Sequence, residues 1–167
     1  ILISPMIVPL IITSAGMFFF YSKIGLTHTY LGLILAHTAL GTPFVVITVT
    51  ATLTGFDTNL IRASQSLGAD TMRTFFKVIM PLILPGVISG ALFAFITSFD
   101  EVVVVMFVGS VEQITIPKQM WAGLRQETSP VILCMATCLV ALSIALLTTV
   151  ELLRRRSERL RGIKLRN

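Results

Sequence analysis

The stretch Arg62-Ala-Ser-Gln-Ser-Leu-Gly-Ala69, followed by Val78-Ile-Met-Pro81, is a polar, weakly basic interval between long apolar segments. A loop that only joined two apolar helices would need a few polar residues and a turn. This interval instead contains two short helical patterns that meet at Gly68. The sequence therefore predicts a structured docking element rather than a plain connection.

The apolar segments on either side are long enough to cross a membrane. Only 13% of the 167 residues are charged, and the mean hydropathy is +0.90. Each uncharged run supplies the roughly 20 residues that a hydrocarbon core of about 30 Å requires. We expect an all-α, polytopic membrane bundle, one transmembrane domain over 1–167, with helices at about 3–21, 30–53, 82–99 and 130–153. A soluble fold is disfavoured because too little polar surface would remain to cover four apolar helices.

The basic residues predict the orientation of these helices. Ten of the 13 Lys and Arg residues lie in the central loop, 57–80, or in the tail, 154–167. The excess of positive charge on cytoplasmic loops then places the central loop and the C-terminus in the cytoplasm. Because Arg154, Arg155 and Arg156 directly follow an apolar helix, we interpret the tail as a flank that contacts anionic lipid of the bilayer, and we expect no nucleic-acid partner.

The central loop has the signals of two helices joined by a turn. Asp57 can cap a helix that begins at Thr58, and Gly68 stands where a left-handed residue would end it. Asp70 can cap a second, amphipathic helix, after which Pro81 would bend the chain into the membrane. The apolar stripe of this second helix comprises Met72, Phe75, Phe76 and Ile79.

The same residues resemble a known sequence pattern. Ala63-Ser64, Gly68 and, after nine intervening residues, Val78-Ile-Met-Pro81 have the spacing of the cytoplasmic "EAA" loop of ABC importer permeases, with Arg62 at the Glu position of that pattern. Further segments are similar to permeases of the spermidine/putrescine subfamily: Ser98-Phe-Asp-Glu101, Thr115-Ile-Pro117 and Met120-Trp121. Such permeases usually have six helices, and this chain would correspond to the last four.

The resemblance implies a transport subunit of a bacterial inner membrane that is not itself an enzyme. The loop would dock on an ABC ATPase, with coupling residues Arg62, Ala63, Ser64, Leu67, Gly68 and Ala69. A second permease subunit and an external solute-binding protein would complete the importer. No phosphate-binding Gly-rich loop ending in Lys-Ser/Thr is present in the sequence, so ATP and Mg would be bound by the ATPase. For this chain we expect no catalytic residue, no metal site and no cofactor.

Two acidic residues between apolar segments, Asp100 and Glu101, are the candidates for the substrate pathway, where they would attract a cation such as a polyamine. The alternative is that Asp100 only ends a helix at the membrane interface and that Glu101 points to water. His37 is interpreted as a hydrogen-bonded structural residue, although it could lie on a pathway. The small residues Gly86, Gly90 and Ala94 favour close helix packing.

A second class of function stays open from the sequence. The chain could belong to an ATPase-independent secondary transporter or a channel component. An ion-coupled carrier needs no docking helix and would be expected to have more charge near the middle of the membrane. The central loop therefore favours the ATP-driven importer.

Overall fold

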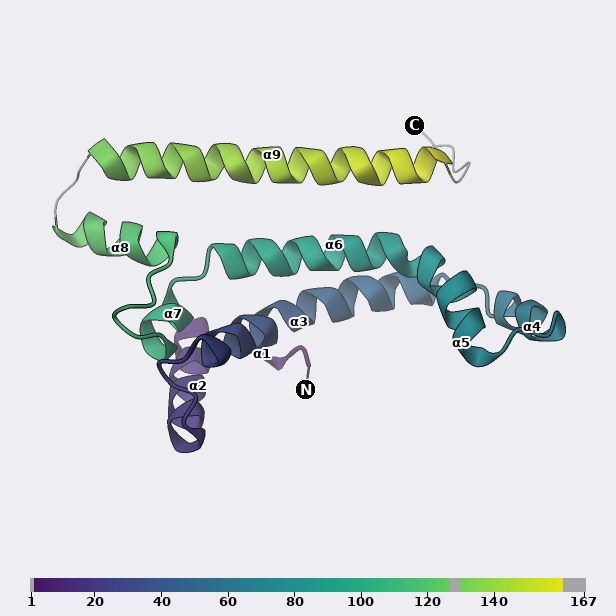
Figure 1. Cartoon of the computed structure of the whole chain (residues 1–167), viewed down its shortest axis with the longest axis horizontal. Coiled ribbons are helices and arrows are strands. Elements are labelled where there is room, and N and C mark those ends of the chain that lie inside the picture. Colours follow the sequence, from purple (N-terminus) through teal and green to yellow (C-terminus); the bar gives the residue numbers. More distant parts are fainter. Residues whose placement is uncertain (1, 127–129, 161–167) are drawn as a thin grey trace. The chain divides into compact units, whose positions relative to one another are not determined.

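A computed structural model describes residues 2–126 and 130–160, and every regular element in this part of the chain is a helix. The described residues divide into two compact units, Ile1–Pro117 and Lys118–Asn167. In the first unit the elements follow the chain in order (Figure 1): α1 (Ser4–Ile7), α2 (Leu10–Ile24), α3 (Tyr30–Thr54), α4 (Asn59–Ser66), α5 (Thr71–Thr74), the π-helix η1 (Phe75–Ile79), α6 (Met80–Phe99) and α7 (Val103–Val108). α8 (Ile116–Gln126) and α9 (Pro130–Leu160) follow.

Among the described residues, three helical segments are long and apolar enough to cross a membrane: Tyr30–Thr54, Thr71–Phe99 and Pro130–Thr149. The first expected helix, at about 3–21, is instead divided into α1 and the 15-residue α2. Pro9 causes the division, because the residue before a proline is forced out of the helical region. Val8 accordingly has an extended ψ of 136°.

A second difference between the prediction and the structure concerns Pro81. The chain changes direction there, as predicted, but it stays helical from Thr71 through Phe99 (Figure 1). The five-residue π-turn η1 precedes the proline, and the Met80 N–H bonds to the carbonyl of Phe75. A π-turn widens the helix locally, so the chain can bend next to a proline that lacks an N–H. The segment 71–79 and α6 are thereby one continuous element.

α3 packs along α6 through the predicted stripe of small residues. Gly86 and Gly90 are buried, and a Cβ at Gly86 would collide with the hydroxyl of Thr52. A Cβ at Gly90 would lie 2.8 Å from the Cα of Val45, which cannot move away without the helix backbone. The two helices therefore approach as closely as glycine allows.

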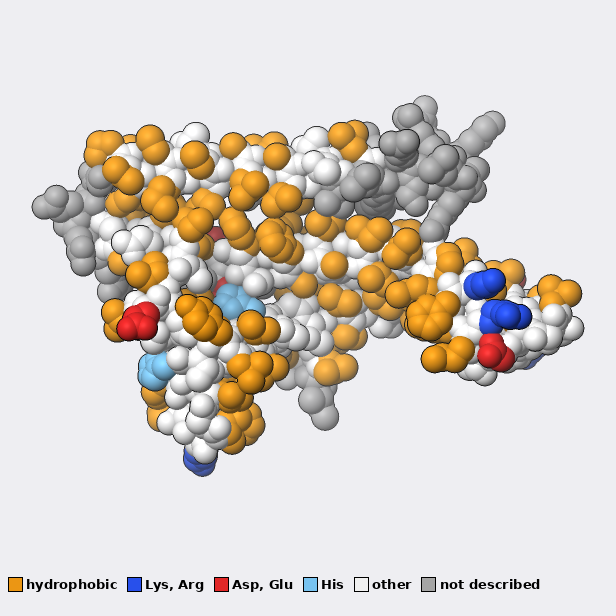
Figure 2. All heavy atoms as spheres, viewed as in Figure 1, with side chains coloured by type: hydrophobic (Ala, Val, Ile, Leu, Met, Phe, Trp, Pro, Cys, Tyr) orange, Lys and Arg blue, Asp and Glu red, His pale blue; other side chains and the backbone are white. Residues whose placement is uncertain are grey.

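The buried core of the first unit lies where α2, α3 and α7 meet. It consists of Tyr21, Leu33, Ala36, Leu40, Val104, Val105 and Val108. Neither α7 nor α8 is predicted from the sequence. Elsewhere the helices expose large hydrophobic side chains, while charged side chains gather over α4 and α5 (Figure 2).

Candidate functional site: a capped cytoplasmic loop and a membrane cavity

The loop that is expected to face the cytoplasm begins with a short helix, and a side chain that precedes the helix bonds to its first turn. The Asp57 carboxylate accepts a hydrogen bond of 2.9 Å from the Asn59 N–H, so Asp57 bonds to the start of the helix as predicted, although the N-cap position itself is Thr58. The helix itself, α4, starts at Asn59, one residue later than expected. Because an isolated helix of eight residues is marginal in water, such local bonds decide whether it forms.

Gly68 ends α4 in the left-handed conformation, with φ at +81°. The Gly68 N–H bonds to the Gln65 carbonyl at 2.9 Å, and the Ala69 N–H bonds to the Ser64 carbonyl at 3.0 Å. These two bonds make a Schellman motif, which satisfies carbonyls that the helix end would otherwise leave unpaired. The predicted turn at Gly68 is therefore confirmed.

A pair of hydroxyl groups ties α4 to the following helix. Ser64 Oγ lies 2.8 Å from Oγ1 of Thr74, whose side chain is buried. Ser64 also donates to the carbonyl of Ile61 at 2.9 Å. Since a carbonyl only accepts, the single Ser64 proton is used there, and Thr74 donates to Ser64. Asp70 caps α5 through the Arg73 N–H at 2.8 Å, as predicted.

The loop presents an apolar surface beside its charged groups. Leu67 is 89% exposed, Met72 is 66% exposed and Phe76 is 60% exposed. We call these three residues the loop surface. Arg62 and Ala63 are also exposed, whereas Ser64 and Ala69 are half-buried. The six residues expected to couple to an ATPase thus form one continuous capped segment, and their coupling role stays a prediction.

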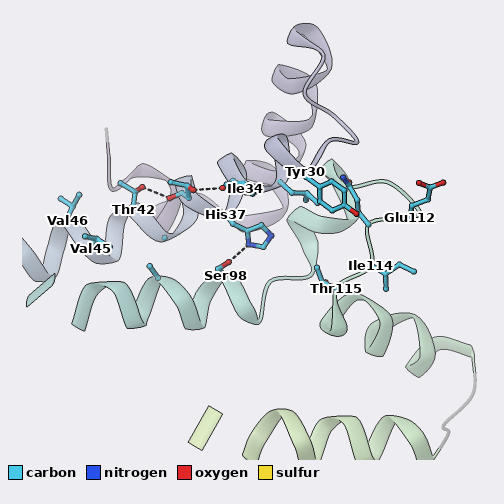
Figure 3. Close-up of a pocket in the computed structure, with 15 residues that line it drawn as sticks. Tyr30, Ile34, His37, Thr42, Val45, Val46, Ser98, Glu112, Ile114 and Thr115 are labelled. Atoms are coloured by element: carbon cyan, nitrogen blue, oxygen red, sulfur yellow. Dashed lines mark hydrogen bonds between the residues drawn. The ribbon is translucent and has the colours of Figure 1, made fainter. Parts of the chain in front are cut away.

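A cavity of about 790 Å³ lies at the other end of α3 and α6 (Figure 3). α6 contributes Ala94 and Ser98, and the segment 112–115, which follows α7, lines its outer end. α3 supplies one stripe of lining residues: Tyr30, Leu33, Ile34, His37, Thr38, Gly41, Thr42, Val45 and Val46. From Tyr30 to Val46 the stripe extends about 24 Å along the helix. The cavity is therefore elongated.

His37 joins the two helical walls of the cavity. Its Nδ1 lies 2.9 Å from Ser98 Oγ (Figure 3), so the predicted hydrogen bond of His37 is confirmed. The Glu101 carboxylate also acts electrostatically on His37. The sequence predicts mainly a structural role for His37, and the structure additionally places this residue in the cavity wall.

Asp100 and Glu101, the acids expected on the substrate pathway, are not among the described residues that line this cavity. Asp100 is exposed and ends α6, as one interpretation of the sequence held. Glu101 is only 6% exposed, so the expectation that it points to water is wrong. Its Oε1 accepts the Val104 N–H at 2.7 Å and caps the first turn of α7. A role of either acid in the pathway stays a prediction.

Two loops at the outer end of the first unit are joined by hydrogen bonds that the sequence does not predict. The His28 N–H bonds to the Val108 carbonyl at 2.9 Å, and His28 Nδ1 donates to the Gly109 carbonyl at 3.1 Å. These bonds hold His28 at φ 61°, which is uncommon for a residue other than glycine. The buried Gln113 accepts the Ser110 N–H at 2.9 Å. The segment that closes the cavity is therefore fixed by backbone contacts.

Comparison with known proteins places this architecture in a family. The spermidine/putrescine transport system permease protein PotC of Haemophilus influenzae is 32% identical over 152 residues, which cover 91% of this chain and 59% of that protein. PotC of Escherichia coli K12 is 30% identical over 150 residues, covering 90% and 57%. The putrescine transport system permease protein PotI of the same strain is 28% identical over 145 residues, covering 82% and 51%.

The chain thus spans somewhat more than half the length of these relatives. Residues 1–159 match the family described as binding-protein-dependent transport system inner membrane component. The chain belongs to that family of ABC importer permeases, in its spermidine/putrescine branch.

Proposed function

We propose that this chain is part of the membrane pathway of an ATP-driven importer and that its cytoplasmic loop couples the pathway to a separate ATPase. The observation that carries the proposal is the loop itself. α4 is capped at both ends, bound to Thr74 through Ser64, and followed by a leucine that is 89% exposed. A rigid helix with an exposed apolar anchor is suited to a groove on another protein.

The substrate we propose is a small organic cation such as a polyamine. Relatives bear the names of spermidine/putrescine and putrescine transport systems. Physical support comes from the cavity, whose described lining includes the carboxylate of Glu112 and no lysine or arginine. Such a wall attracts cations rather than anions.

The partners follow from this function. ATP and Mg are held by the ATPase, a second permease subunit forms the other wall of the pathway, and an external solute-binding protein delivers the substrate. The exposed hydrophobic side chains of the helices contact lipid or these subunits. In the inner membrane the loop and the C-terminus face the cytoplasm, as the basic residues predict. The chain itself catalyses no reaction.

A crosslinking experiment tests the proposed coupling. The two native cysteines, Cys134 and Cys138, are first replaced by serine, and Leu67→Cys is then introduced in the complex expressed with its ATPase. We expect a short bifunctional reagent to join Leu67→Cys to the ATPase. Leu31→Cys is the matched control, because Leu31 is 56% exposed at the opposite end of α3. No crosslink at position 67, or equal crosslinking at both positions, would contradict the proposal.

A further inference from the structure

Two threonines in the cavity wall have hydroxyl groups whose protons are used within the helix, as they are for other threonines of this chain. Thr38 Oγ1 donates to the Ile34 carbonyl at 2.7 Å, and Thr42 Oγ1 donates to the Thr38 carbonyl at 2.7 Å. Both residues line the cavity, and Figure 3 draws these bonds along α3. A carbonyl oxygen can only accept, so each hydroxyl proton is directed at the helix backbone.

The consequence is that these two threonine side chains offer a ligand acceptors only. With its proton committed, each threonine oxygen has lone pairs left for a ligand and no proton to donate. A ligand that brings N–H donors finds two partners, whereas an anion or a carbonyl compound finds none on these side chains. The two residues are four positions apart, which places their oxygens about 6 Å apart along the helix. This spacing is comparable to that between the two nitrogens of a short aliphatic diamine.

Two further lining residues bear on the same ligand. Glu112 is an exposed carboxylate at one edge of the lining, and Tyr30 contributes an aromatic ring (Figure 3); His37, Ser98, Gln113 and Thr115 are the other polar residues of the lining. An ammonium group inside a membrane is stable only where hydrogen bonds and negative charge replace its water.

We propose that Thr38 and Thr42 form a transit site for primary ammonium groups, which selects substrates by their number of N–H donors. The inference rests on the proposed transport function and goes beyond it, because it assigns the recognition of the substrate within the membrane to two named side chains. Discrimination by N–H donors is distinct from discrimination by net charge. A quaternary ammonium compound of equal charge lacks these donors.

The test compares isosteric variants in the complete importer, reconstituted in proteoliposomes with its ATPase and binding protein. Thr38→Val and Thr42→Val remove the acceptors and keep the side-chain shape, while Thr38→Ser and Thr42→Ser keep the hydroxyls. Thr54→Val is the matched control: Thr54 lies on the same helix and donates to the Thr50 carbonyl at 2.7 Å, but it is outside the cavity. Uptake is measured for putrescine and for an analogue in which one nitrogen is trimethylated, so that this nitrogen keeps its charge but has no N–H donor.

We expect each valine variant to lower putrescine uptake at subsaturating concentration about tenfold, the effect of losing one hydrogen bond from a charged donor. Uptake of the methylated analogue should fall less, while the serine variants and Thr54→Val transport both compounds like the wild type. The binding protein also discriminates, but its contribution cancels in the ratio of variant to wild type. This ratio separates lost recognition from a merely damaged fold, which would lower both compounds equally.

A failure of the proposed transit site can be distinguished from a failure of the proposed transport function. If the wild-type complex shows no ATP-driven uptake, the function itself is wrong. If the wild type transports putrescine and the cavity variants behave like Thr54→Val, only the transit site is wrong. An equal loss for both compounds would also overturn it, because recognition would then not depend on N–H donors.

Discussion

The left-handed turn at Gly68 offers a test of coupling in which only the backbone is perturbed. A Cβ built at Gly68 has no atom within 4 Å, so a substituted side chain would meet open space. The cost of Gly68→Ala therefore comes from φ alone, at +81°, and amounts to roughly 1–2 kcal/mol. A β-branched valine is worse in this conformation, whereas asparagine tolerates it.

This cost applies to α4, a helix that is only marginally stable by itself. α4 has eight residues, and its C-terminal carbonyls depend on the turn that Gly68 makes. A loss of 1–2 kcal/mol reduces the population of the capped loop by a factor of roughly 5–30. If this segment docks on the ATPase, fewer substrate molecules will be transported for each ATP hydrolysed.

The assay is the ratio of putrescine transported to ATP hydrolysed in proteoliposomes. We expect the ratio to decrease in the order wild type, Gly68→Asn, Gly68→Ala and Gly68→Val. Gly16→Ala, in α2, is the control, because its Cβ also meets no atom within 4 Å and its φ is not positive. Equal ratios for Gly68→Ala and the wild type, or equal damage by asparagine and valine, would refute the reasoning.

Three further contacts are tested through the thermal stability of variants of the purified complex. Ser64→Ala should cost about 1–3 kcal/mol, because it leaves the buried Thr74 hydroxyl without its acceptor, and adding Thr74→Ala should recover part of the loss; additive losses would contradict the bridge. Glu101→Gln keeps an oxygen for the α7 cap and should be tolerated, whereas Glu101→Ala should cost about 1–3 kcal/mol, and equal melting temperatures would exclude the cap. Gly90→Ala should lower stability by about 1–3 kcal/mol through overpacking against α3, and an unchanged melting temperature would show that the helices can separate.

The parts of the fold that could be predicted from the sequence are those set by local interactions. The caps at Asp57 and Asp70 and the turn at Gly68 depend on bonds between residues at most five positions apart. The break before Pro9 follows from equally local chemistry, but the long apolar run around it favoured one continuous helix. The location of Glu101 could not be predicted, because its burial depends on how α7 packs.

α7 shows why other parts of the fold could not be predicted from the sequence. Its sequence, Val103-Val-Val-Met-Phe-Val108, is rich in β-branched residues, and a short apolar run cannot be assigned to a helix or a strand by periodicity. Packing against α2 and α3 buries Val104, Val105 and Val108 completely. The cavity likewise arises from the pairing of α3 with α6, which joins His37 to a serine 61 residues later. No local pattern contains that information.

α6 is continuous with the helical segment of the loop 57–80, which suggests how a displacement of the loop is transmitted to the cavity. From Met80 to Ser98 the helix extends about 27 Å, and it begins directly after the π-turn that follows α5. Along this length Gly86 and Gly90 lie so close to α3 that a Cβ at either position would collide with it. We therefore expect α3 and α6 to move as one body when the loop is displaced, with η1 as the point that bends. The bond between His37 and Ser98 would then be kept while the pair changes its exposure to either side of the membrane.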